Sequence, residues 1–265
     1  MSLILRPTRT TQPTQPVGID RGNGLTLGLG FAWTPQFVVD QNGNITATNP
    51  GNTSTAPTAV FAKYGVGNKY NASSAYWTGP GQVAETGGRT RFALLRVGSA
   101  SSTRAILSNG GNGGCMLRIT NNTDVVWVIT GSTVAWTLAS AVAAGEYCFL
   151  VVTLNADNIS YKVYKNGVLL VSTTAANTAG SSGNLTPYVA QSGAASSYGD
   201  HEIYLTGSFN RELSASEVAS LSLNPWQIFQ PISRRIWMPS IGGGGGFTAV
   251  NRRSTGPRVG SRSYY

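Results

Sequence analysis

Short apolar runs separated by turn residues make up most of the chain from residue 25 onward. The runs include TRFALLRV, RAILS, CMLRIT, DVVWVIT, EYCFLVVTL, ISYKVYK, VLLVST and EIYLTGSF. Their length, their β-branched and aromatic content and their regular spacing are typical of strands joined by tight turns. The pattern predicts an all-β protein built as a two-sheet antiparallel sandwich, with helix as the minority state.

One of these runs, EYCFLVVTL at residues 146–154, is apolar at both alternating sets of positions. A strand of this kind lies in the middle of a sheet that is covered on both faces. We expect hydrophobic inward faces to include Leu150, Val152, Leu154, Val163, Ile203 and Leu205.

The segment YKVYKNGVLLV predicts a hairpin whose tip is Asn166 and Gly167. A two-residue type I′ turn needs positive φ at both of its central positions, and Asn and Gly tolerate this conformation best.

A single short helix is predicted within FNRELSASEVASLSLNPWQIFQP, residues 209–231. Ser214 and Glu217 have the spacing of a capping box, in which each side chain bonds the backbone amide of the other residue. Helical periodicity turns Val218 and Leu221 inward, and we expect the helix to lie across one end of the sandwich.

The charge of the chain is concentrated at its two ends. The formal net charge is +9, but residues 25–232 are nearly neutral, while residues 233–265 carry six arginines and no acidic residue. A nucleic-acid groove on the folded part therefore has little electrostatic support. We divide the chain into an N-terminal arm at 1–24, a sandwich at 25–232 and a Gly/Arg-rich C-terminal arm at 233–265.

Two further sequence features bear on the compartment of the protein. The chain has no apolar run long enough to span a membrane and no secretory signal at its start, so we expect synthesis in a cytoplasm without membrane anchoring. Cys115 and Cys148 lie in apolar runs and are predicted to be core residues. The alternative is a disulfide between them on neighbouring strands.

The hairpin and the capped helix together resemble the concanavalin A-like lectin and glucanase superfamily, in its laminin-G-like branch. The matching residues are Tyr164, Asn166 and Gly167 for a Tyr-x-Asn-Gly turn, and Leu213, Ser214 and Glu217 for a Leu-Ser-x-x-Glu helix start. The resemblance implies a jelly-roll sandwich.

Two more stretches narrow the resemblance. NPWQIFQP, which follows the helix, and the opening LILRPTRTTQP with GIDRGNGLTLGLGFAW are similar to laminin-G-like proteins encoded in tailed-phage and prophage structural regions. This similarity implies a bacteriophage virion component made in the host cytoplasm, either a capsid decoration or a tail-attached protein.

No catalytic constellation is found in the sequence, so we expect no enzymatic activity and no cofactor. The Glu-x-Asp-x-x-Glu spacing of the superfamily's glucanases does not occur in the chain. His201 is the sole histidine; strand alternation puts it on one face with Ile203 and Leu205, as for a structural histidine.

The family often binds calcium at one rim of the sandwich, and the candidate ligands here are Asp124, Asp157 and Asp200. Hard cations need several oxygen ligands, and only Asp200 has a second acid close by, Glu202. We therefore favour aspartates that stabilise turns and predict no metal site.

Four aromatic residues in loops rich in Gly, Ser and Asn are candidates for stacking on sugar rings: Tyr70, Tyr76, Trp77 and Tyr198. The alternative is that these rings pack under long loops or against a neighbouring subunit.

The C-terminal arm combines glycines with arginines that can bind carboxylates and with apolar residues that can anchor the arm. The predicted assembly contacts are Arg234, Arg235, Phe247, Arg252, Arg253, Arg258, Arg262, Tyr264 and Tyr265. Two functions remain. One is a virion structural protein whose arms dock on capsid or tail subunits, as a homo-oligomer in the assembly. The alternative is a glycan-binding receptor-recognition module of a tail fibre or a cell-surface protein.

Overall fold

The computed structural model describes a large part of the sandwich region and little of the arms. The described residues are 11–13, 17–40, 45–47, 57–70, 77–78, 88–99, 103–109, 116–121, 123–129, 133–157, 159–174, 187–190 and 200–231. Residues Met1–Gln230 form one compact unit and Pro231–Tyr265 a second, in which only Pro231 is described.

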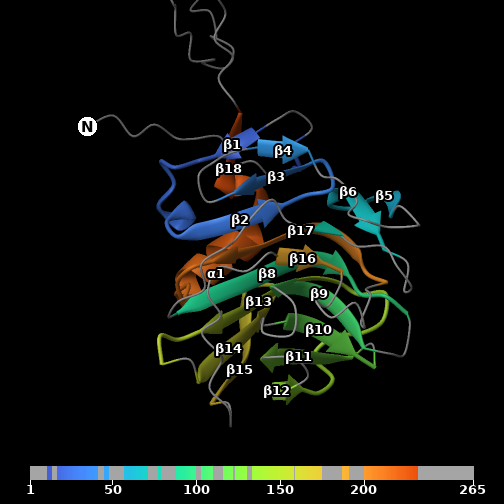
Figure 1. Cartoon of the computed structure of the whole chain (residues 1–265), viewed down its shortest axis with the longest axis vertical. Coiled ribbons are helices and arrows are strands. Elements are labelled where there is room, and N and C mark those ends of the chain that lie inside the picture. Colours follow the sequence, from blue (N-terminus) through green and yellow to red (C-terminus); the bar gives the residue numbers. More distant parts are fainter. Residues whose placement is uncertain are drawn as a thin grey trace, which may run out of the picture. The chain divides into compact units, whose positions relative to one another are not determined.

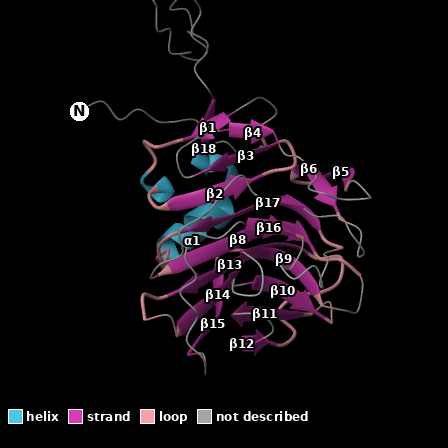
Figure 2. Cartoon of the chain, in the orientation of Figure 1, coloured by secondary structure: helices cyan, strands magenta, loops and turns pink. Residues whose placement is uncertain are grey.

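The first unit is a two-sheet antiparallel sandwich, as predicted (Figures 1 and 2). The larger sheet has the order β15-β14-β13-β8-β17-β2-β3-β4, and β6, itself paired with β5, adds to β17 beside β2. Its strands are β2 (Leu29–Trp33), β3 (Phe37–Asp40), β4 (Ile45–Ala47), β5 (Thr58–Ala62), β6 (Gly65–Lys69), β8 (Arg89–Arg96), β13 (Tyr147–Leu154), β14 (Ser160–Lys165), β15 (Val168–Thr174) and β17 (Glu202–Phe209).

The second sheet has the order β12-β11-β10-β9-β16-β7. Its strands are β7 (Trp77–Thr78), β9 (Arg104–Asn109), β10 (Met116–Thr120), β11 (Asp124–Ile129), β12 (Thr133–Leu138) and β16 (Pro187–Val189). The remaining elements are the ribbon of β1 (Val17–Ile19) and β18 (Phe229–Pro231), the α-helix α1 (Ala215–Leu223), and the 3₁₀ helices η1 (Gly24–Thr26) and η2 (Pro225–Ile228). Among the described residues, no helix is long and apolar enough to cross a membrane.

Two hydrophobic layers cover the two faces of the larger sheet. The inner layer lies between the sheets and joins Leu150, Val152 and Ile203 to residues of the second sheet such as Ile106 and Leu117. The outer layer lies on the opposite face, where α1, η2 and the β1–β18 ribbon bury the other half of the same strands. Strand β13 is covered on both faces, as its apolar pattern predicts.

The predicted local motifs are confirmed. Asn166 and Gly167 adopt φ values of 52° and 84° between the paired strands β14 and β15. The amide of Glu217 donates to Ser214 Oγ at 3.3 Å, and the amide of Ser214 donates to Glu217 Oε2 at 2.9 Å. The capping box therefore starts α1 where the sequence places it.

Two predictions of position are wrong. Helix α1 lies on the outer face of the larger sheet, not across one end of the sandwich, because Val218 and Leu221 pack with residues of β8, β13 and β14. Leu205 is buried on this outer face, while Ile203 is on the inner face. A register shift between Ile203 and Leu205 makes Tyr204 the extra residue of a bulge in β17. The side chains of Ile203 and Leu205, which would share a face in a regular strand, therefore point to opposite faces of the sheet.

The folded part of the chain also begins earlier than residue 25. Val17 and Ile19 are buried in β1, although the sequence places them in the N-terminal arm. This strand has only two inward side chains, so its pattern is too short to stand out among the prolines before it.

Candidate functional site

Of the four aromatic residues predicted to stack on sugars, Tyr70 alone has its side chain in the described part of the chain. Tyr70 is 1% exposed and packs on Trp33 with ring centroids 6.2 Å apart, so its ring has no solvent face for a sugar. Trp77 lies in β7, but its side chain is outside the described part, as are Tyr76 and Tyr198. The burial of Tyr70 agrees with the alternative interpretation for this one residue.

The predicted assembly contacts of the C-terminal arm, Arg234 through Tyr265, all lie outside the described residues. Cys115 is also outside them, whereas Cys148 is a free thiol in the inner core, where burial raises its pKa to about 12.

Two of the three candidate calcium ligands hold turns together. Asp157 accepts hydrogen bonds from the amides of Ile159 and Ser160, both at 2.9 Å. Asp124 accepts from the amide of Ser140 at 3.0 Å. Within the described part of the chain, no three His, Cys, Asp or Glu side chains gather as a metal site.

His201 is buried, and its Nδ1 accepts from the amide of Gly98 at 2.9 Å. Burial lowers the pKa of this imidazole to about 4, against a smaller opposing effect of Asp200. The ring is therefore neutral near neutral pH, and its environment is that of a structural histidine.

A cluster of three tyrosines, which the sequence did not single out, lies at the edge of the outer face. This tyrosine cluster consists of Tyr64, between β5 and β6, Tyr147, at the start of β13, and Tyr204, in β17. The centroid of Tyr64 lies 5.9 Å from that of Tyr147 and 6.0 Å from that of Tyr204, and the Tyr147 and Tyr204 centroids are 6.2 Å apart. Gly67 lets the β5–β6 hairpin approach, because a Cβ there would lie 2.7 Å from the Tyr204 ring.

Charged side chains border the tyrosine cluster in a row that crosses four strands. Tyr147 pairs with Arg96, Arg96 with Glu202, and Glu202 with Lys69. Directly paired residues of neighbouring strands point to the same face of a sheet, so this row shares the outer face. The carboxylate of Glu202 accepts from Arg96 Nη1 at 2.9 Å and from the Tyr204 hydroxyl at 3.0 Å.

The cluster has a buried base and a more accessible rim. Tyr204 is fully buried, and desolvation, followed by its hydrogen bond to Glu202, raises the pKa of its hydroxyl. Tyr64 and Tyr147 are only partly buried, and the Arg96 side chain is 43% exposed. Lys63 Nζ lies 5.2 Å from the Tyr64 centroid, and the Arg96 guanidinium lies 5.5 Å from that of Tyr147.

The chemistry of the rim suits a polar ligand with apolar patches. Aromatic faces bind the C–H faces of a sugar ring, while a guanidinium and an ammonium group bind oxygens. Local sequence could not reveal this site, because residues 64, 96, 147 and 202 meet only through strand pairing.

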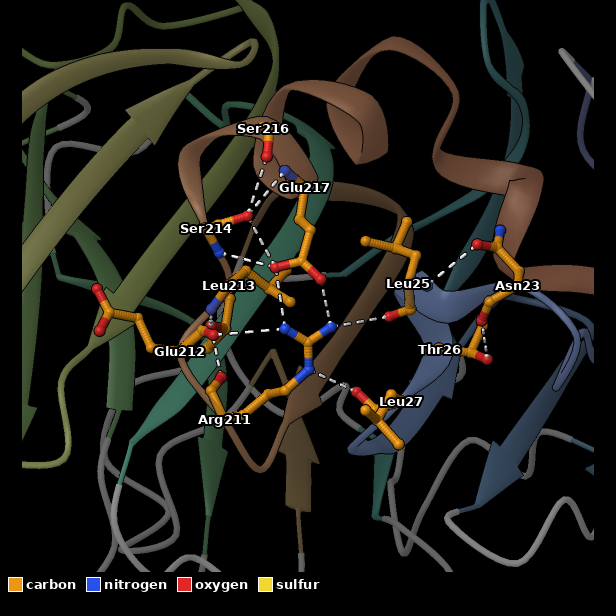
Figure 3. Close-up of polar contacts among 11 residues, drawn as sticks. Asn23, Leu25, Thr26, Leu27, Arg211, Glu212, Leu213, Ser214, Ser216 and Glu217 are labelled. Atoms are coloured by element: carbon orange, nitrogen blue, oxygen red, sulfur yellow. Dashed lines mark hydrogen bonds and ion pairs between the residues drawn. The ribbon is translucent and has the colours of Figure 1, made fainter.

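A second constellation joins the N-terminal segment to the helix. Figure 3 shows the Arg211 guanidinium between the Glu217 carboxylate and the backbone carbonyls of Leu25 and Leu27. Arg211 Nη2 lies 2.6 Å from Glu217 Oε1, and Nη1 lies 2.9 Å from Oε2. This paired contact lowers the pKa of Glu217 to about 2, the hydrogen bonds from Arg211 being the largest cause.

The same region brings together the points where the two arms begin. Strand β1 pairs with β18, the Asp20 amide donates to the Ile228 carbonyl at 2.8 Å, and Gln230 Nε2 donates to the Ile19 carbonyl at 3.1 Å. Phe229 packs edge-on against Phe37 of β3, with centroids 5.5 Å apart. Both ends of the sandwich region therefore lie near the β3–β4 edge, away from β15.

Comparisons with known proteins identify the fold. No family model and no curated protein matches the sequence. Among solved structures, the botulinum neurotoxin serotype D binding domain matches with a TM-score of 0.54 and 14% identity over 74% of this chain and 50% of that one. A botulinum neurotoxin type C structure matches with a TM-score of 0.55 and 13% identity over 76% of this chain and 52% of that one.

A sialidase from Trypanosoma rangeli matches with a TM-score of 0.53 and 18% identity over 77% of this chain and 33% of that one. The chain thus spans about half the length of the neurotoxin structures and a third of the sialidase. At these identities the likeness establishes the fold alone, and it is consistent with the concanavalin A-like and laminin-G-like sandwich that the sequence motifs indicate.

Proposed function

We propose that this protein is a non-enzymatic glycan-recognition module whose sugar-contacting surface is the tyrosine cluster. The observation that carries the proposal is that two partly exposed tyrosine rings lie beside an exposed guanidinium on the outer face. Buried neighbours position both groups, since Glu202 holds Arg96 and Tyr204 packs against both rings. Such preorganisation lowers the entropic cost of binding.

Several proteins of the same fold bind sugars, which supports this function. Cell entry of botulinum neurotoxin type C depends on interaction with two ganglioside molecules. A serotype D domain has been solved in complex with N-acetylneuraminic acid, and a related binding domain with rat synaptotagmin II. The last complex makes a protein receptor the competing ligand class.

The arrangement of the described carboxylates favours binding over hydrolysis. Glu146, Glu202, Glu212 and Glu217 each form an ion pair, with Lys165, Arg96, Lys162 and Arg211 respectively. A glycosidase needs one carboxylic acid and one carboxylate facing each other across the scissile bond. In the described part of the chain, each of these glutamates faces a basic partner and not a second carboxylate.

Binding of the full-length chain to an array of host-surface glycans would test the proposal. We expect Tyr147→Ala and Tyr64→Ala to weaken binding about tenfold or more, because each removes a stacking face. Tyr188→Ala, at a partly exposed tyrosine of the other sheet, is the matched control and should bind like the wild type. The absence of glycan binding by the wild type would refute the proposal.

A second proposed role is attachment to a virion through the arms, as a capsid decoration or tail-attached protein. The pairing of β1 with β18 favours it, because both arms then begin from the same two-stranded ribbon. Removing residues 240–265 should leave a folded sandwich that no longer stays on the particle. Normal copy number of the truncated protein on purified particles would contradict this role.

A further inference from the structure

The charges around the tyrosine cluster are unbalanced in a way that points to the kind of sugar. Lys63 and Arg96 lie over the rings of Tyr64 and Tyr147, Lys69 pairs with Glu202 at the end of the row, and Glu202 is the one carboxylate in this row. Lys63 and Lys69 are exposed, while the Glu202 side chain is only 11% exposed. A ligand would therefore meet positive charge at the rim.

Arg96 can donate hydrogen bonds to a ligand while it remains bound to Glu202. Its Nη1 donates to Glu202 at 2.9 Å and its Nε donates to the Gly145 carbonyl at 3.3 Å. Among the residues that the structure describes, none accepts a hydrogen bond from Nη2. The Arg96 side chain is 43% exposed, and a guanidinium whose Nε and Nη1 are fixed can donate from its remaining N–H₂ group to an external carboxylate.

The neighbouring acid, Glu146, does not compete with a ligand for Arg96. Glu146 precedes Tyr147 in the chain, but its Oε1 lies 3.0 Å from Lys165 Nζ and its Oε2 accepts from the Ala143 amide at 2.9 Å. Its charge is therefore compensated by Lys165 at the end of β14 and by the turn that precedes β13.

We propose that the tyrosine cluster selects sugars that carry a carboxylate. The ring of the sugar would lie on Tyr64 and Tyr147, and its carboxylate would accept from Arg96 Nη2, with Lys63 and Lys69 adding attraction at longer range. This inference rests on the proposed glycan-binding function and names the ligand class for the same site. It also assigns Arg96 as the residue that determines specificity.

Titration of the full-length chain with single sugars tests the assignment. The acidic probes are N-acetylneuraminic acid and glucuronic acid, and the neutral probes are N-acetylglucosamine and glucose. We expect the acidic sugars to bind at least about tenfold more tightly than the neutral ones, as a charge-assisted hydrogen bond predicts. Added salt should reduce this preference, because the charges lie at an exposed rim.

Variants at Arg96 identify the residue responsible. Arg96→Gln should abolish the preference for acidic sugars, and Arg96→Lys should restore part of it by returning the charge without the planar group. Arg96→Gln leaves the Glu202 carboxylate without its ion-pair partner, which can unfold the region locally. The double variant Arg96→Gln/Glu202→Gln removes this unpaired charge and should show the same loss of preference for acidic sugars. Lys162→Gln removes a basic group of similar exposure, at 44%, from the Glu212 ion pair on the same sheet and should keep the preference.

The outcomes separate the two proposals. Equal binding of acidic and neutral sugars, or an acid preference that survives in the folded double variant, overturns the specificity inference and leaves glycan binding standing. Binding that Tyr147→Ala and Tyr64→Ala do not alter removes the cluster from the site altogether. If the wild-type protein binds neither the arrayed glycans nor any of the four sugars, the proposed function itself is overturned.

Discussion

The ion pair between Arg211 and Glu217 should make the stability of the sandwich depend on pH in a defined window. Glu217 accepts from Arg211 and from the Ser214 amide, and these contacts lower its pKa from 4.5 to about 2. In Glu217→Gln, the amide oxygen can still accept from Ser214, since Gln serves at this position of a capping box. The substitution therefore removes the charge of the pair and leaves most of the cap.

The magnitude follows from the difference between the folded and unfolded pKa values. A carboxyl group whose pKa falls from 4.5 to about 2 on folding stabilises the folded state by at most about 3 kcal/mol. The two side chains are 26% and 29% exposed, so solvent screening should reduce this to about 1–2 kcal/mol. Because the folded-state pKa is lowered, the contribution is complete above about pH 4.5 and is lost as the pH falls through about 2.

Urea unfolding of the wild type and of Glu217→Gln, followed by tryptophan fluorescence, measures this contribution at a series of pH values. We expect the variant to be less stable by about 1–2 kcal/mol near neutral pH and the difference to shrink by at most about 1.4 kcal/mol per pH unit below pH 4.5. A constant difference between wild type and Glu217→Gln down to about pH 2 would refute the reasoning.

Further substitutions test the packing of the larger sheet. Gly207→Ala should cost at least about 1–3 kcal/mol of unfolding free energy in chemical denaturation, because the new Cβ would lie 2.3 Å from the Phe31 carbonyl oxygen. Gly18→Ala, where no atom lies within 4 Å of the new Cβ, is its control and should change stability by less than about 1 kcal/mol. The buried imidazole of His201 should make the wild type lose stability as the pH falls from about 6.5 to about 4, because the unfolded chain binds the proton first. His201→Gln should remove this loss. A pH profile of the variant identical to that of the wild type would argue against this explanation.

The features that the sequence predicted correctly are those that adjacent residues determine. Asn166 and Gly167 specify a turn type, and Ser214 and Glu217 specify a helix start, because each motif closes its hydrogen bonds within four residues. The two-faced apolar pattern of β13 was equally local. Each of these motifs reflects a backbone requirement that few other residues meet.

The features that it missed depend on the pairing of distant strands. Tyr147, Arg96 and Glu202 form one row only because β8 lies between β13 and β17 in a particular register. The extra residue at Tyr204 determines which side chains beyond it face α1, and no local signal distinguishes this shift from regular alternation. Aromatic residues in loops were therefore the visible candidates, while the cluster on strands was not.

The N-terminal segment connects the two proposed roles, because it reaches the hairpin that carries Tyr64. Gln12 Nε2 donates to the Val66 carbonyl at 2.9 Å, and Gln12 Oε1 accepts from the Val66 amide, so this side chain pairs with β6 as a neighbouring strand would. The same hairpin closes over Tyr204 at Gly67, where there is no room for a side chain. An assembly that binds the N-terminal arm would thus act on the element that positions one wall of the tyrosine cluster. Both proposed roles therefore involve β6, because a partner of the N-terminal arm would contact a segment whose Gln12 side chain binds the hairpin that carries Tyr64.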